Sequence, residues 1–193
     1  MGSGKLISEP RSLPAFTGIQ VTGIAKVVLK QDTVQSLRIE ADDNIMDHIT
    51  TAVNNGLLVV GLRQGSYNNV TINVFASMKT IDRLECVGTA DIASSGPIQT
   101  NGITCRVTGT GSITLSGTAT NQTIEVTGTG DVHNFGLVSN RCAATITGVG
   151  SLEVNVTQQL DAVISGSGSI VYAGNPGVVN KSIVGIGSVR PKS

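Results

Sequence analysis

The sequence is poor in aromatic residues: it has no tryptophan, and aromatic side chains make up only 3% of its 193 residues. It also lacks a charge excess, because 13 lysine and arginine residues balance 13 aspartate and glutamate residues. A chain without net charge has no overall field to attract nucleic acid or an anionic membrane. No apolar run approaches the roughly 20 residues of a membrane-spanning helix. We therefore expect neither a nucleic-acid-binding protein nor a transmembrane segment.

Cysteine is scarce and irregularly spaced. Cys86, Cys105 and Cys142 make an odd number and form no C-x-x-C pair. Such a set predicts neither a disulfide framework nor a zinc site, and no other motif indicates a cofactor. The first residues, Met1–Lys5, lack the apolar stretch of a signal peptide. The residues alone therefore leave open a cytosolic protein or an exported one whose leader has been removed.

What the sequence has in abundance is glycine, with 24 residues. A phrase made of glycine, a variable residue, a tiny residue, then Ser or Asp, and then an aliphatic residue returns at intervals of 18 to 21 residues. Its six copies open at Gly88, Gly109, Gly128, Gly148, Gly166 and Gly185. In phosphate-binding loops a G-x-G phrase leads into a helix, whereas each copy here leads into a strand-like run. We therefore interpret the phrase as a structural repeat.

Apolar residues recur around each glycine with a period of two, the pattern of strands with one buried face. The position two before the glycine holds Cys86, Val107, Val126, Ile146, Ile164 and Ile183, and the position four after it is also aliphatic. A unit of about 20 residues cannot bury such a face alone and must stack on copies of itself. The repeat predicts an all-β fold, a single-stranded parallel β-helix (β-solenoid) with coils of about 19–20 residues. By the same parity, all three cysteines should point inward.

The N-terminal part is less regular. Segments within 18–29, 36–41, 56–62 and 69–76 have strand patterns, and residues 44–53 predict one short helix with Asp42, Asp43 or Asn44 as its N-cap. No linker-like stretch divides the chain. We expect one domain over residues 1–193, with irregular coils at 9–80 and regular coils at 81–190.

Several segments resemble the GIN domain, a family described as the head domain of autotransporter adhesins. These are residues 11–31, 38–45 and 171–176, together with the G-x-G series between them, so that the resemblance extends over roughly residues 9–190. It implies a right-handed parallel β-helix from a bacterial protein of the Bacteroidetes type. It also implies a secreted, periplasmic or cell-surface location, and it supplies no catalytic residues.

Four ionisable residues are the candidates for catalysis, because enzymes that cleave polysaccharides also use parallel β-helices. Asp131 and His133 should share one face, with Glu153 beside His133 one coil along and Asp91 in the column of Asp131 two coils away. At the strand spacing of sheets, the two aspartates would lie about 9–10 Å apart, near the upper limit for an inverting glycosidase. No basic cluster or aromatic platform accompanies them, so we interpret them as solvated surface residues.

Two further columns face outward. Glu85, Arg106 and Glu125 should stack as an alternating charge ladder that favours the register. Thr108, Thr127, Thr147 and Ser165 form a strip of hydroxyl groups, and this strip is the candidate binding face. The favoured function is a non-enzymatic binding or adhesion module of the cell envelope, whose partner is a glycan or a surface protein. The alternatives are a polysaccharide-degrading enzyme and a structural spacer, and the solenoid edges could form a homo-oligomer.

Overall fold

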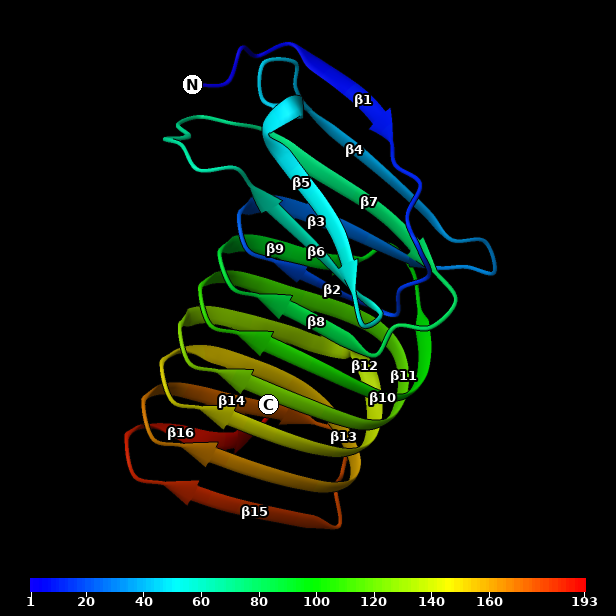
Figure 1. Cartoon of the computed structure of the whole chain (residues 1–193). Helices are drawn as coiled ribbons and strands as arrows, with labels where there is room; N and C mark the ends of the chain where they lie inside the picture. The colour runs from blue at the N-terminus through cyan, green and yellow to red at the C-terminus, as the bar shows by residue number, and fades with distance from the viewer.

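A computed structural model describes all 193 residues and shows one 16-stranded sheet wound into a stack of coils (Figure 1). The parallel β-helix predicted from the repeat is confirmed. The strands are β1 (Leu6–Pro10), β2 (Gly18–Val21), β3 (Ile24–Gln31), β4 (Ser36–Asp42), β5 (Ile49–Asn54), β6 (Leu57–Leu62), β7 (Ile72–Met78), β8 (Arg83–Cys86), β9 (Thr89–Ser94), β10 (Ile98–Val107), β11 (Thr110–Val126), β12 (Thr129–Ile146), β13 (Val149–Ile164), β14 (Ser167–Ala173), β15 (Val178–Ile183) and β16 (Ile186–Pro191).

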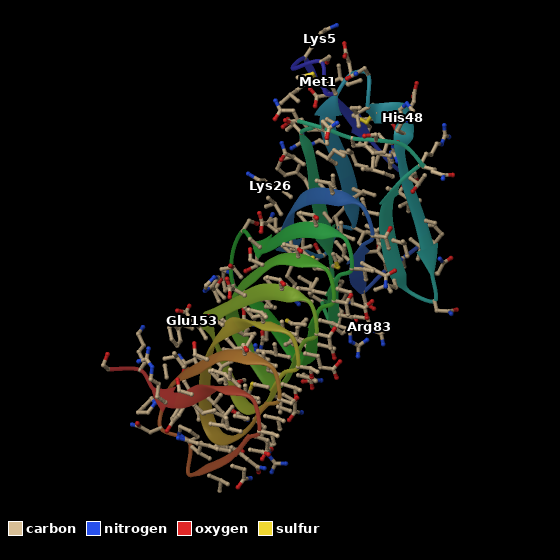
Figure 2. The ribbon with its side chains drawn as sticks, turned by 90° about the vertical axis from the view of Figure 1, so that its left-hand side faces the viewer. Met1, Lys5, Lys26, His48, Arg83 and Glu153 are labelled. Carbon is tan, nitrogen blue, oxygen red and sulfur yellow. The ribbon has the colours of Figure 1, made fainter.

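Each coil contributes to two faces. The front face runs β1-β4-β7-β3-β9 and continues through the first parts of β11, β12 and β13 into β14 and β16. The back face runs β5-β6-β2-β8-β10 and continues through the later parts of β11, β12 and β13 into β15. Figure 2 shows Lys26 and Glu153, both of the front face, on the side of the molecule opposite to Arg83 of the back face.

The two faces meet at the repeated glycines, where backbone groups of successive corners bond to one another. The Thr108 amide donates to the Cys86 carbonyl at 2.9 Å, and the Thr110 amide donates to the Gly88 carbonyl at 2.9 Å. A Cβ on Gly109 would lie 1.9 Å from the Gly88 carbonyl oxygen. Corners packed this closely leave no room for a side chain, which is why glycine returns at each of them.

The alternation of buried and exposed residues matches the predicted columns. In the column two before the corner glycine, Cys86, Val107, Val126, Ile146 and Ile164 are fully buried. The residues one position later, such as Thr127 and Thr147, are exposed. The inward side chains form one core cluster that runs through the whole stack, so each coil buries its apolar side chains against its neighbours above and below.

The helix expected at residues 44–53 is reduced to a single turn of 3-10 helix, η1 (Met46–His48), and β5 occupies the rest of that segment. Asp42 does not cap this turn: its carboxylate accepts the amide N–H groups of Gly4 at 2.7 Å and Thr71 at 2.8 Å. β5 instead pairs antiparallel with β6 across Asn55 and Gly56, whose φ angles are 50° and 76°. Positive φ at both central residues is typical of a tight hairpin turn, for which Asn-Gly is the preferred sequence.

Antiparallel strands cover the N-terminal end of the stack. On the front face β4 pairs antiparallel with β7, and β1 pairs antiparallel with β4. On the back face β5 is the last strand. Arg11 connects the two layers, because its guanidinium donates to the Ile49 carbonyl at 2.8 Å and to the Thr51 hydroxyl at 3.2 Å. The four segments with strand patterns in this region form β2, β3, β4, β6 and β7, as predicted.

The three cysteines are buried and unpaired, as their parity predicted. Burial raises the pKa of the Cys105 thiol to about 12 and raises the pKa of the Cys86 and Cys142 thiols above the ordinary value. The thiolate is the reactive form, so native protein at pH 8 should react with a thiol reagent far more slowly than protein in denaturant. The time course of reagent consumption measures this, and rapid reaction of all three thiols without denaturant would contradict the inward placement.

Candidate ligand-binding groove

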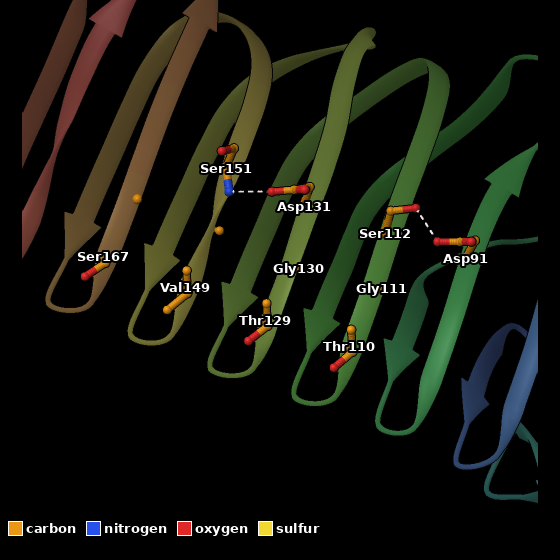
Figure 3. Close-up of a pocket in the computed structure, with 12 residues that line it drawn as sticks. Asp91, Thr110, Gly111, Ser112, Thr129, Gly130, Asp131, Val149, Ser151 and Ser167 are labelled. Carbon is orange, nitrogen blue, oxygen red and sulfur yellow. Dashed lines mark hydrogen bonds between the residues drawn. The ribbon is translucent and has the colours of Figure 1, made fainter.

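A shallow groove crosses the strands of the front face just after the glycine corners (Figure 3). Its floor is the backbone of glycines two positions after the corner glycine in four successive coils: Gly111, Gly130, Gly150 and Gly168. A Cβ at any of these four positions would lie 1.9 to 2.3 Å from a carbonyl oxygen of the preceding coil. The floor must therefore stay free of side chains, and the repeat makes it continuous.

Polar side chains form the two walls. One wall follows the residues directly after each corner, Thr110, Thr129, Val149 and Ser167, and the other follows Asp91, Ser112, Asp131 and Ser151. The groove has a volume of about 670 Å³, and Val149 is its one hydrophobic residue among the 12 that line it. It therefore offers hydroxyl, carboxylate and backbone groups at the regular spacing of the strands.

The two groove carboxylates are held by neighbours on adjacent coils. Asp91 accepts a hydrogen bond from the Ser112 hydroxyl at 2.7 Å, and Asp131 accepts one from the Ser151 amide at 2.7 Å. Both pairs are drawn in Figure 3. No lysine or arginine lines the groove. Because each carboxylate keeps its position through a neighbour, the wall is a fixed row of acceptors.

The groove continues toward the N-terminal end as a second hollow of about 320 Å³. The two hollows share Asp91, and Lys26 lines the second one beside it. Lys26 is the register partner of Asp91 on the adjacent strand β3. The row of acceptors thus has one cationic side chain at this end.

The structure places all four candidates for catalysis on the front face. Ser112 of β11 stands in register between Asp91 and Asp131, which are therefore two strand spacings apart. His133 and Glu153 occupy the next outward column and bond to each other, with 3.0 Å between His133 Nδ1 and Glu153 Oε2. Only the two aspartates line the groove. The histidine and the aspartates thus belong to parallel columns and do not converge on a common atom.

The hydroxyl strip lies outside the groove. The strip consists of the exposed residues one position before each corner glycine: Thr108, Thr127, Thr147 and Ser165. The nearer wall of the groove begins one position after the same glycines, so the row of corner glycines forms a crest between the two. The strip and the groove therefore share the crest but present separate surfaces. The groove was not predicted, although the second glycine of each phrase is the signal that marks its floor.

The charge ladder is present on the back face. The guanidinium of Arg106 contacts Glu85 at 3.3 Å and Glu125 at 2.8 Å, and the side-chain amide of Gln20 donates to Glu85. The hydrogen bond to Glu125 raises the pKa of Arg106. These contacts run from coil to coil, so they support the register and leave the groove unaffected.

The structure contains no helix with the length and apolar character needed to cross a membrane. It also contains no group of three or more His, Cys, Asp and Glu side chains placed to share a metal ion.

Solved structures of similar fold come from Bacteroides and Parabacteroides species. A "putative adhesin" from Bacteroides fragilis has a TM-score of 0.79 at 23% identity, with 99% of each chain covered. A "putative lipid binding protein" from Parabacteroides distasonis has a TM-score of 0.60 at 22% identity, with 100% of this chain and 98% of that chain covered. A "putative adhesin" from Parabacteroides merdae has a TM-score of 0.58 at 20% identity and the same coverage. At these identities the likeness establishes the fold.

The comparison with curated proteins found no match. The family model described as "Putative auto-transporter adhesin, head GIN domain" matches residues 15–176. That range contains the N-terminal strands from β2 onward, all strands that form the groove, and the "VYAGNP" segment at its end. The chain therefore belongs to this family of GIN domains.

Proposed function

We propose that the protein is a non-enzymatic binding module of the bacterial cell surface that holds an extended polysaccharide in the front-face groove. The observation that carries this proposal is the floor of the groove, which is bare backbone over four successive coils. A continuous floor suits a linear polymer, because equivalent groups recur at each strand. A rigid solenoid also loses little conformational entropy when such a ligand binds.

The lining favours a carbohydrate over a lipid. Only one of the 12 lining residues is hydrophobic, while serine and threonine hydroxyls and two carboxylates supply hydrogen-bond partners. One structure of similar fold is described as a lipid-binding protein, but an acyl chain would find only one hydrophobic side chain, Val149, in this groove. Without tryptophan, sugar rings cannot stack on indole groups, so each site should be weak. Useful affinity then requires many copies of the module.

A polysaccharide-degrading enzyme is the second candidate, and the observation that favours it is the pair Asp91 and Asp131 in one groove. Two carboxylates about 9–10 Å apart are near the limit for an inverting mechanism. We prefer binding because the histidine lies in a separate column, where Glu153 engages it. The names of the family and of the similar structures also point to adhesion.

The test is retention on polysaccharide. The domain is displayed in many copies on a bead, and its retention is measured on envelope polysaccharides and host glycans. Replacing Ser112 and Ser151 together by arginine fills the groove from its wall and should lower retention at least about tenfold, since a long side chain then occupies the ligand's path. Thr127→Arg, beside the crest and outside the groove lining, adds one charge at a comparable exposed position and should leave retention intact.

Activity is followed in the same samples through release of reducing ends. His133→Ala, outside the groove lining, should bind as the unchanged protein does. Asp131→Asn removes one charged acceptor from the groove wall and should lower retention, and no variant should release product. Product formation that Asp131→Asn abolishes would establish the enzyme instead. Loss of retention in Thr127→Arg, together with full retention in the double arginine variant, would show that the ligand binds to the hydroxyl strip and not in the groove.

A further inference from the structure

Both strands of the last coil have an unpaired edge, as β1 and β5 have at the other end of the stack. β15 pairs only with β13, and β16 pairs only with β14. Figure 1 shows the two strands at the end of the stack opposite to β1 and β5. Unpaired edges present rows of amide and carbonyl groups that can accept another strand.

The core is also open at this end. Ile183 is 43% exposed, although the five residues that precede it in its column are fully buried. At the adjacent corner Val184 and Ile186 are 85% and 80% exposed, where most other coils have threonine or serine. This end therefore combines strand edges with apolar surface, which is the composition of a docking site rather than of a solvated face.

The charge of the residues at this end indicates which kind of partner could bind there. Residues 162–193 contain three basic side chains, Lys181, Arg190 and Lys192, and no acidic one, whereas residues 81–161 contain seven acidic and three basic side chains. A second copy that met this end with its own last coil would bring like charges together, which is unfavourable. An acidic partner would be attracted.

Lys181 specifies the position of the partner's charge. It continues the inward column of Ala144 and Ala162, and its ammonium lies 5.6 Å from the centre of the Tyr172 ring. There it donates to the Val189 carbonyl at 2.8 Å. This side chain thus crosses the end of the core from β15 toward β16. A strand added to β15 would set its inward side chains over Val179, Lys181 and Ile183, which are apolar, basic and apolar.

We propose that the edge of β15 binds an extended segment of a partner protein whose inward side chains read apolar, acidic, apolar. The segment adds a strand to the back face, covers Val179 and Ile183, and places its carboxylate on Lys181. This site is separate from the groove and does not depend on the proposed function.

The experiment uses two labelled heptapeptides, Thr-Val-Thr-Glu-Thr-Val-Thr and Thr-Val-Thr-Lys-Thr-Val-Thr, with binding measured by fluorescence anisotropy up to millimolar protein. The protein should bind the glutamate peptide at least about tenfold more tightly than the lysine peptide, because opposite charges meet over Lys181. Lys181→Glu should reverse this preference. Arg141→Glu, an equal change of charge on an exposed residue of the regular coils, should leave the preference as it is.

Three results would overturn the proposal. The first is binding of neither peptide, or of both equally. The second is a preference that Lys181→Glu does not reverse. The third is occupation of this end by something else: a dimer in sedimentation velocity that Ile186→Asp dissociates, or capture by vesicles of anionic phospholipid that Val184→Asp prevents.

Discussion

Ile146→Asp is expected to unfold the protein at 25 °C. Ile146 is fully buried, and in its inward column Val126 lies in register on one side and Ile164 on the other. Aspartate would lose the apolar contacts and leave a carboxyl group without a partner in the core. Losses of this kind reach about 4–5 kcal/mol, which matches the lower end of the roughly 5–15 kcal/mol by which native domains are stable.

Thr147→Asp is the matched control, because Thr147 is the next residue and is exposed. This substitution should change stability by no more than about 0.5 kcal/mol. Circular dichroism with thermal and urea denaturation compares the two variants. Equal melting temperatures would mean that the inward and outward columns are assigned wrongly.

Gly128→Ala should destabilise the protein by about 2–3 kcal/mol, which lowers the melting temperature by roughly 5–10 °C for a chain of this size. A Cβ on Gly128 would lie 2.1 Å from the Gly109 carbonyl oxygen and 2.4 Å from the Thr108 carbonyl oxygen. Both atoms belong to the backbone of the preceding corner, so neither can move without disturbing the hydrogen bonds between coils.

Gly102→Ala provides the comparison, since a Cβ on Gly102 has no atom within 4 Å. It should leave stability unchanged or raise it slightly by restricting the unfolded chain. Differential scanning calorimetry of both variants measures the difference. A Gly128→Ala variant as stable as Gly102→Ala would show that the corners do not approach as closely as described.

The regular coils could be predicted because the same constraint acts on every repeat. Residues such as Val126 and Ile146 alternate with exposed threonines, and glycine returns wherever corners stack. A single strand of this length would be ambiguous, but six copies in register remove the ambiguity. The ladder at Arg106 follows from the same columns.

The N-terminal segment could not be predicted by the same means, because no repeat covers it. Residues 44–53 contain acidic residues before an apolar pattern, which locally favours a helix. The stronger signal was Asn55-Gly56, whose hairpin pairs β5 with β6. The segment forms a strand and not a helix because, as β5, it pairs with β6 and covers the edge of that strand.

The core also contains a residue that its column does not predict. Gln122 stands in register between Ile103 and Cys142, and neither its side-chain oxygen nor its nitrogen has a hydrogen-bond partner. A buried polar group without a partner costs about 1–3 kcal/mol. A pattern of apolar positions predicts that a site is inward, but it does not predict which residue occupies the site.

The register of the candidate residues on one face follows from the sequence columns, whereas the groove depends on packing. Asp91 and Asp131 share a column because both are register partners of Ser112, one on each side of it. The hollow beside them lies between the two rows of outward side chains, and the backbone of Gly111 and Gly130 forms its floor. The columns of the sequence show which residues align from coil to coil. The depth of the surface between two columns can be known only from the structure.

The most direct test of the account is a nuclear magnetic resonance titration of ¹⁵N-labelled protein with oligosaccharides cut from the polysaccharide that the displayed domain retains. Binding in the groove predicts shifts in the amide signals of Gly111, Gly130 and Gly150, on its floor, while the sugar stays intact. Shifts confined to residues of the back face, or cleavage of the oligosaccharide during the titration, would contradict it.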